Sequence, residues 1–302
     1  MHLVGLFADN LLPVFLAAGA GYALAATLRP DPRALSHAAF YVFAPCLMFQ
    51  IIVDNPMSPA VVLRMVGFAS TVLLGGAALA GLLARWIGWP RPLASAIVLV
   101  VLLPNAGNFG LSANALAFGQ EGLVQASLFF VTAAVLTFSV GVFVASVGRT
   151  NLRGALAGLW RVPAIWAVTV ALLMTRLGWK LPGPAASTVH TLSQACVPVF
   201  LVILGLQLHA TRSRAPVRPL IFAVCLRLLG GPLLALGLAP LFALDGPGRQ
   251  AAILQASMPS AVICTVLAAE YDVEPGFVTS VVFFSTLLCP LTMTPLLAYL
   301  GA

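Results

Sequence analysis

The stretch LPNAGNFG, residues 103–110, decides how this chain is interpreted. It holds a proline, two asparagines and two glycines inside one of the most apolar parts of the sequence. Proline lacks a backbone amide and clashes with the preceding turn of a helix, whereas glycine adopts backbone angles that other residues resist. The stretch therefore predicts an interruption within an otherwise helical segment.

The composition places the chain in a lipid bilayer. Of its 302 residues, 61% are hydrophobic and 8% are charged, which leaves too few polar groups to cover a water-soluble surface. Apolar runs of about 20 residues, enough to cross about 30 Å of hydrocarbon, recur along the whole length. We predict an all-α polytopic membrane protein with ten transmembrane helices over residues 5–28, 34–53, 60–84, 92–118, 122–147, 161–178, 185–208, 217–242, 250–270 and 276–300.

The basic residues predict the orientation of these spans. Ten of the fifteen lie in or beside the odd-numbered loops, namely Arg29, Arg33, Arg85, Arg91, Arg149, Arg153, Arg161, Arg212, Arg214 and Arg218. Because Lys and Arg accumulate in short cytoplasmic loops, we expect both termini on the extracytoplasmic side of a cell (inner) membrane. The same bias accounts for the net charge of +7, so we expect the lipid bilayer, and no nucleic acid, as a partner.

Prolines inside the spans indicate an internal repeat. They form three matched pairs, 150, 153 and 155 residues apart: Pro13 and Pro163, Pro45 and Pro198, and Pro104 and Pro259. Residues 1–150 and 151–302 then form two five-helix repeats in one membrane unit. Because each half has an odd number of spans, the second enters the membrane from the opposite side, and the repeat is inverted.

The third pair differs from the other two in its expected role. Kinks that only shape packing are the favoured interpretation of the first two pairs, because transmembrane helices tolerate proline where neighbours satisfy the freed carbonyl. Interrupted segments at corresponding positions of two halves are instead typical of the binding site of a carrier. We therefore expect a function for the breaks at Pro104 and Pro259.

Both breaks are expected near the bilayer midplane. The segment from Arg91 to Leu103 rises about 18 Å before the first break, and the segment from Gln250 to Met258 rises about 13 Å before the second. After each break a new half-helix begins and exposes free amides and the positive end of its dipole.

Two positive helix ends that face one volume predict an anion site, with asparagine and serine side chains as further donors. The substrate-binding residues that we predict are Pro104, Asn105, Gly107, Asn108, Gly110, Ser257, Pro259, Ser260 and Arg227.

Arg227 lies roughly 13 Å into the eighth span when counted from Arg218 at helical rise. A charge at this depth suggests a counter-charge for the anion. Its long side chain could instead extend to the cytoplasmic interface. The sequence leaves these two interpretations open.

No metal or cofactor site is expected. The five cysteines all fall inside predicted spans without metal-binding spacing, so they are interpreted as small apolar residues. Coupling to Na⁺ or H⁺ stays open, since none of the carboxylates is central in a span.

Three segments resemble the auxin efflux carrier family of the bile acid/auxin-type transporter superfamily: LLPNAGNFGLSANALAFGQEG at 102–122, QASMPSAVICTVLAAEYDVEP at 255–275 and STLLCPLTMTPLLAYL at 285–300. The resemblance implies crossing broken helices four and nine, and alternating-access transport of a carboxylate. It implies a substrate-facing role for Asn105 and the second crossover proline at Pro259. Bacterial members often carry an asparagine near the position of Ile263, and this chain departs from them there.

We therefore expect a secondary active transporter of small organic anions, such as auxin-like monocarboxylates or malate-like and malonate-like dicarboxylates. An anion channel or uniporter is the first alternative, and an intramembrane enzyme is the second. We expect no enzymatic activity, because no nucleophile and base are placed for it at depth. A homodimer is an open alternative for the oligomeric state.

Overall fold

The computed structural model describes residues 2–28, 30–55, 58–146, 163–210 and 215–302. These residues are helical apart from short connections, and their one β feature is an isolated antiparallel bridge between Pro104 and Ser260. The prediction of an all-α protein is confirmed for this part of the chain. The boundary at 150/151 between the predicted repeats lies outside the described residues, as do Arg29, Arg149, Arg153, Arg161, Arg212 and Arg214.

The first half of the chain contains the elements α1 to α8. Their bounds are α1 (His2–Leu6), η1 (Phe7–Leu11), α2 (Leu12–Leu28), α3 (Pro32–Ala38), η2 (Ala39–Phe43), α4 (Ala44–Asp54), α5 (Pro59–Trp86), α6 (Arg91–Leu102), η3 (Ala106–Leu111), α7 (Ser112–Leu136), η4 (Thr137–Gly141) and α8 (Val142–Ala145). Within α7 the backbone leaves helical geometry at Gly119, with φ 63° and ψ −153°. This positive φ suits glycine. The kink falls between the predicted end of span four, at residue 118, and the predicted start of span five, at residue 122.

The second half contains the elements α10 to α16. Their bounds are α10 (Pro163–Leu177), α11 (Gly183–Ala210), α12 (Val217–Cys225), η6 (Leu226–Gly230), α13 (Gly231–Leu238), η7 (Ala239–Phe242), α14 (Gly246–Ala256), α15 (Ile263–Glu270) and α16 (Pro275–Leu300).

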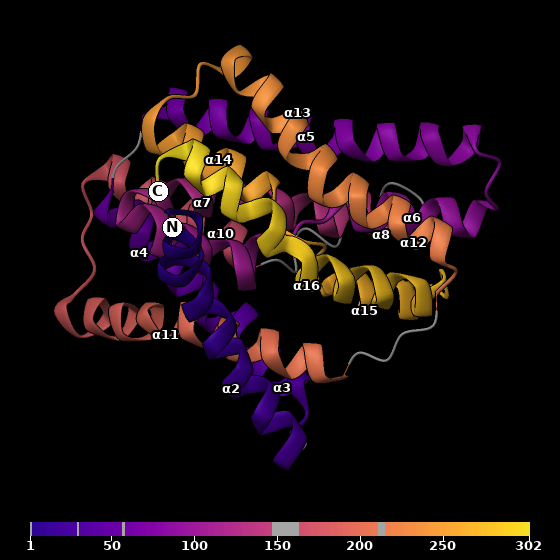
Figure 1. Cartoon of the computed structure of the whole chain (residues 1–302). Helices are drawn as coiled ribbons and strands as arrows, with labels where there is room; N and C mark the ends of the chain where they lie inside the picture. The colour runs from indigo at the N-terminus through magenta and orange to yellow at the C-terminus, as the bar shows by residue number, and fades with distance from the viewer. Residues whose placement is uncertain (1, 29, 56–57, 147–162, 211–214) are drawn as a thin grey trace.

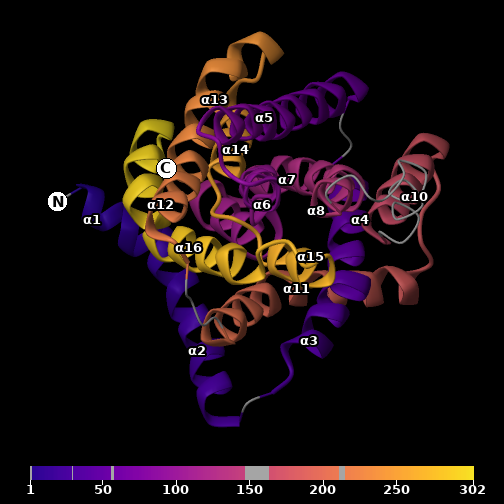
Figure 2. The same ribbon diagram turned by 90° about the vertical axis from the view of Figure 1, so that its right-hand side faces the viewer.

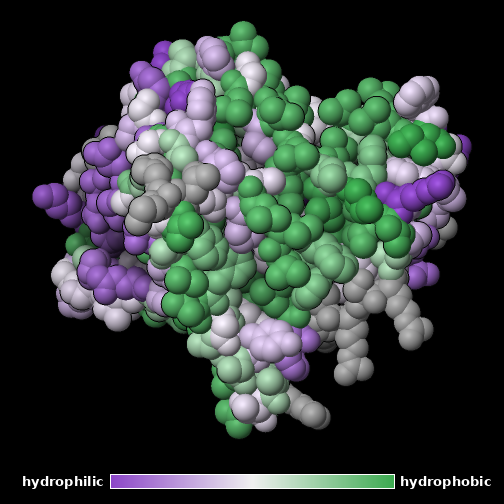
Figure 3. All heavy atoms as spheres, viewed as in Figure 1, coloured by the Kyte–Doolittle hydropathy of each residue, from purple (hydrophilic) through white to green (hydrophobic). Residues whose placement is uncertain are grey.

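Seven helical segments of the described residues are long and apolar enough to cross a membrane. They are Val4–Leu28, Ala34–Asp54, Pro59–Trp86, Ala106–Ala145, Gly183–His209, Val217–Phe242 and Pro275–Leu300, whereas Arg91–Leu102 and Pro163–Leu177 are shorter apolar helices. Figure 3 shows apolar residues across the middle of one face, with hydrophilic residues gathered toward its left and right sides. This distribution fits a protein embedded in lipid.

Several prolines follow π-helical turns. Pro13 follows η1, Pro45 follows η2, and Pro232 follows η6. A proline ring clashes with the carbonyl four residues earlier, and a wider π turn before the ring is a local adjustment that relieves such crowding. Pro13 and Pro45 therefore lie within the continuous helical segments Val4–Leu28 and Ala34–Asp54.

The helices pack in two groups that each combine elements from both halves of the chain. In the first group, α2 and α4 pack against α11, and α4 also packs against α10. The second group contains α5, α6, α7, α13, α14 and α16. In both views, α2, α3 and α11 lie together toward the lower edge, whereas α5 and α13 lie at the opposite edge (Figures 1 and 2).

The backbones of α2 and α11 approach one another at two glycines. A Cβ at Gly205 would lie 1.8 Å from the carbonyl oxygen of Ala18, and a Cβ at Gly21 would lie 2.1 Å from that of Val202. Small residues permit such approach between membrane helices, where close packing replaces the hydrophobic driving force found in water. Gly21 and Gly205 therefore permit the close approach of α2 and α11.

Candidate functional site

Both predicted breaks occur in the structure, and both are buried. The helix α6 ends at Leu102, and Leu103 is extended, with φ −107° and ψ 94°. The chain becomes helical again at Ala106, in η3, which continues into α7. In the second break, α14 ends at Ala256 and α15 begins at Ile263.

The two breaks pair with each other through their backbones. The amide of Asn105 donates to the carbonyl of Pro259 at 2.7 Å, and the amide of Ala261 donates to the carbonyl of Leu103 at 2.8 Å. These bonds flank the antiparallel bridge between Pro104 and Ser260. Buried backbone groups need partners, and here the groups left free by each interruption find theirs in the other.

The hydroxyl groups of both predicted serines, Ser257 and Ser260, donate hydrogen bonds to backbone carbonyls. The hydroxyl of Ser260 donates to the carbonyl of Val100 at 2.9 Å, and its backbone amide donates to the hydroxyl oxygen of Ser285 at 3.2 Å. The hydroxyl of Ser257 donates to the carbonyl of Ile253 at 2.7 Å. Both side chains thus use their hydroxyl hydrogen on a carbonyl near the end of α6 or α14.

Arg227 lies next to both breaks and is buried, with 2% of its surface exposed. Its Nε donates to the carbonyl of Met258 at 2.7 Å, its Nη1 donates to the carbonyl of Val101 at 2.7 Å, and its Nη2 donates to that of Ala256. The side chain therefore does not extend to the interface, which was one of the two interpretations of the sequence. Its partners are backbone carbonyls.

Asn105 is buried at the first break, immediately before η3. Its side chain is 4% exposed, yet Nδ2 has no hydrogen-bond partner among the described residues. A buried donor left without an acceptor is destabilising by about 1–3 kcal/mol. The backbone amides of Gly107 and Asn108, at the start of η3, have no hydrogen-bond acceptor among the described residues. One side-chain donor and two backbone donors thus lie at the beginning of the new helix.

Asn108 connects this turn to the other packing group. Its Nδ2 lies 3.4 Å from Oε1 of Gln207 in α11, and the ring of Phe109 packs edge-on against Phe15 of α2, with 5.8 Å between centroids. The first break therefore faces the helices α2 and α11. This contact was not predicted, because nothing in the local sequence relates residues 99 positions apart.

The two glycines of the first break allow neighbouring side chains to come close. A Cβ at Gly107 would lie 2.9 Å from the ring of Phe130, and a Cβ at Gly110 would lie 2.1 Å from Oε1 of Gln255. Gln255 is fully buried, and its Nε2 donates to the carbonyls of Ala106 and Ala126 at 3.2 and 3.1 Å. Gly110 thus admits a glutamine that ties α14 to the first residue of η3 and to α7.

Two amide oxygens near the break have no hydrogen-bond donor among the described residues. They are Oε1 of Gln255 and Oδ1 of Asn114, whose Nδ2 donates to the carbonyl of Gly110 at 2.8 Å. Asn114 is fully buried and was missed by the sequence interpretation. Its available signal was a polar amide four residues after Gly110 on an apolar helix.

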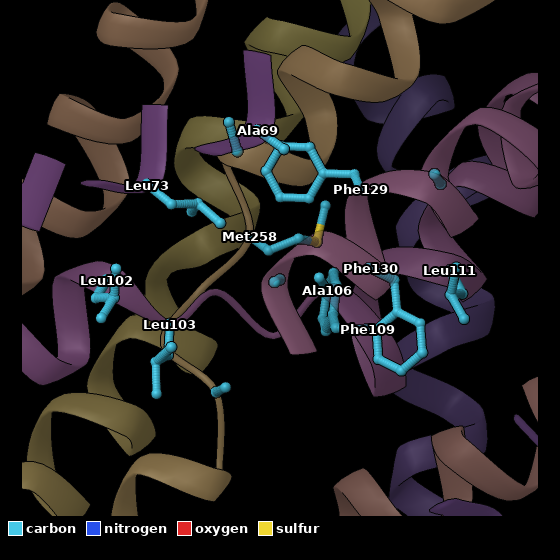
Figure 4. Packing of buried hydrophobic residues seen from close by; sticks show 14 of the residues in the cluster. Ala69, Leu73, Leu102, Leu103, Ala106, Phe109, Leu111, Phe129, Phe130 and Met258 are labelled. Atoms are coloured by element: carbon cyan, nitrogen blue, oxygen red, sulfur yellow. The ribbon is translucent and has the colours of Figure 1, made fainter. Parts of the chain in front are cut away.

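Apolar side chains enclose the paired breaks. Met258, Phe129 and Leu103 are buried, and Figure 4 shows them with Leu73 around the second break. A low-dielectric surrounding strengthens hydrogen bonds to a charged group. An anion that reaches Asn105 would therefore interact strongly with few donors.

A pocket of about 530 Å³ lies at the end of α4, beside the start of α5 and the loop before α14. Gln125 lines it, and the next residue, Ala126, accepts the hydrogen bond from Gln255. The pocket is thus linked to the breaks through one helix of the second group. Its other polar lining residues include Asp54, Asn55, Arg64, Glu121 and Asp245.

Metal ligands do not gather anywhere in the described part of the chain. No group of three or more His, Cys, Asp or Glu side chains is arranged to hold an ion there. All five cysteines are free.

Comparisons with known proteins identify relatives over most of the chain. A family model described as membrane transport protein matches residues 6–297. An uncharacterized transporter of Methanothermobacter thermautotrophicus is 33% identical over 194 residues, which is 64% of this chain and 63% of the relative. An uncharacterized transporter of Methanocaldococcus jannaschii is 26% identical over 194 residues, 63% of each chain.

A plant relative matches a shorter part. Auxin efflux carrier component 8 of Arabidopsis thaliana is 31% identical over 126 residues, which is 41% of this chain and 33% of the relative. The chain thus spans less than two thirds of the length of each of these three relatives.

Proposed function

Because this chain is a membrane transporter of the auxin efflux carrier family, we propose that it carries small organic anions, mono- or dicarboxylates, by alternating access. The family is one of transporters and not of enzymes, which confirms the expectation that the chain has no enzymatic activity. The substrates, in this proposal, are chemically related to the auxin named in the plant relatives.

The observation that carries the proposal is the buried Nδ2 of Asn105 at the paired breaks, which no acceptor of the described residues bonds. A carboxylate would accept from this donor and from the amides of Gly107 and Asn108, at the positive end of the new helix. Such charge-assisted bonds are about twice as strong as neutral ones. These donors favour an anion over a neutral ligand, although no fully charged cationic side chain contacts the ligand.

The proposed architecture is the ten-span inverted repeat. In it, α6 with the segment up to Gly119 is span four, and α14 with α15 is span nine. The pairing of Leu103 and Asn105 with Ala261 and Pro259 supports a crossing of these two spans. The first helix α1 contacts the last helix α16, and termini on the same side, which ten spans require, are part of the proposal.

The proposed transport step is a movement of the second packing group relative to the first. The hydrogen bond between Asn108 and Gln207 and the contact between Phe109 and Phe15 lie between the groups. The first break therefore faces the boundary along which such a movement would expose a bound anion to one side and then the other.

Tags at the two termini test the topology. We expect both Met1 and Ala302 on the extracytoplasmic side, because ten of the fifteen basic residues belong to the odd-numbered loops. Alkaline phosphatase and green fluorescent protein fusions at each end measure this in cells. Fluorescent, phosphatase-inactive fusions at both ends would overturn the orientation, and termini on opposite sides would overturn the ten-span plan.

Uptake into proteoliposomes tests the function. We expect purified full-length protein to take up radiolabelled malonate or indole-3-acetate with saturation, and faster when the vesicles are preloaded with the same anion. Parallel assays with a Na⁺ or a pH gradient identify the coupling ion. Uptake that rises linearly with concentration and ignores preloading would indicate a channel, and no uptake of either anion would contradict the proposed substrate class.

A further inference from the structure

Arg227 is a buried cation that has no acidic partner in the part of the chain that the structure describes. It lies in η6, the π-helical turn between α12 and α13, and is among the largest fully enclosed side chains of the protein. Its recorded partners are three backbone carbonyls, and no carboxylate is among them in the described residues. A charge at such a position is destabilising unless its surroundings compensate it.

The three carbonyls belong to the ends of the two interrupted helices. Val101 lies in the last turn of α6, Ala256 is the last residue of α14, and Met258 follows two residues later. The backbones of these ends are therefore joined through one guanidinium group. Gly231 allows this approach, since a Cβ there would lie 2.6 Å from the carbonyl oxygen of Ala256.

The charges of the helix ends explain why a cation is stable here. A helix carries about half a negative charge at its carboxyl end and about half a positive charge at its amino end. The ends of α6 and α14 together supply about one negative charge, which the guanidinium group of Arg227 compensates. The amino ends of η3 and α15 lie across the breaks, and their positive charge is left without a matching negative end.

We propose that Arg227 is a positioning residue that makes the paired breaks selective for negatively charged ligands. It does so without touching the ligand, by joining and neutralising the carboxyl ends of α6 and α14. Without its charge, the positive and negative helix ends around the breaks would cancel, and Asn105 would bind charged and neutral ligands with similar affinity. The inference rests on the proposed function and extends it to the origin of charge selectivity.

A charge series of ligands tests this inference. Indole-3-acetate, indole-3-acetamide and tryptamine share one ring system and carry negative, neutral and positive charge, and malonate and malonamide form a second pair. We expect the wild-type protein to prefer each anion over its amide. In Arg227→Gln the ratio of the two affinities should fall on the order of tenfold, as for removing a unit charge about 10 Å away at an effective dielectric constant of about 20. Binding to purified protein by scintillation proximity or calorimetry measures the ratio.

Two further variants separate charge from folding. Arg227→Lys keeps the charge, but its ammonium group cannot reach all three carbonyls. We therefore expect weaker binding of all ligands and an unchanged ratio of the affinity for the anion to that for the amide. Arg218→Gln removes an exposed arginine from the start of the same helix α12 and should leave the ratio unchanged. Both variants are assayed whether or not Arg227→Gln folds.

Three outcomes would contradict a proposal. A folded Arg227→Gln that keeps the wild-type ratio would overturn the inference alone. An Arg227→Lys variant that loses the ratio would also overturn it, because the charge is still present. A wild-type protein that prefers the amides or tryptamine would overturn the proposed anion transport, and the inference with it.

Discussion

Replacing Gly205 by alanine is expected to destabilise the protein by roughly 3 kcal/mol or more, even though alanine is the better helix former. The added Cβ would lie 1.8 Å from the carbonyl oxygen of Ala18 and 2.6 Å from the backbone nitrogen of Tyr22. Backbone atoms cannot rotate away as a side chain can, so α2 and α11 must separate, and overpacking of this kind costs about 1–3 kcal/mol or more. Thermal unfolding in detergent and the yield of monodisperse protein measure the effect.

Gly19 provides the matched control on the partner helix. It is exposed, and a Cβ there would meet no atom within 4 Å. Gly19→Ala should therefore raise stability by up to about 1 kcal/mol, the difference in helix propensity between the two residues. If both variants unfold at the same temperature as the parent, the close approach of α2 and α11 does not hold the first packing group together.

The breaks were predictable because their signals are local. Pro104, Gly107 and Gly110 stand together in an apolar segment, and proline or glycine alters the backbone at its own position. Pro259 carries the same kind of signal. The pairing of the breaks was expected only from the resemblance to a family. The backbone hydrogen bond between Asn105 and Pro259 cannot be recognised from the sequence of either segment alone.

The partners of individual side chains were not predictable for the same reason. Arg227 was recognised as unusual from its depth, but its contacts with Val101 and Ala256 depend on how three helices pack. Gly21 and Gly205 resemble other glycines of apolar helices in sequence, and only the packing distinguishes them from Gly19. The hydroxyl of Ser257 donates to the carbonyl of Ile253 in its own helix, and a serine beside a predicted break does not reveal such a bond in its sequence.

Asn105→Asp should abolish anion binding. The substitution keeps the size of the side chain but replaces the free Nδ2 donor by an acceptor that carries a negative charge when ionised. Losing one charge-assisted hydrogen bond costs about 1.5–3 kcal/mol, which is roughly a 10- to 150-fold loss of affinity. Repulsion between two carboxylates in a buried site adds to this. Affinity for malonate and indole-3-acetate, measured on purified protein, should therefore fall by about 100-fold or more.

Two alanine variants show whether this loss belongs to the site. Asn105→Ala removes the donor without adding charge, so its affinity should lie between those of the parent and Asn105→Asp. Asn10→Ala removes another buried amide, which donates to the carbonyl of Leu6 within the first span, and it should leave affinity unchanged. Asn105→Asp and Asn105→Ala proteins that fold and bind the anions as the parent does would mean that the ligand lies elsewhere. The paired breaks would then act only as a hinge, and the unpartnered donor of Asn105 would have to find its acceptor in another conformation, because its burial without one is costly in this one.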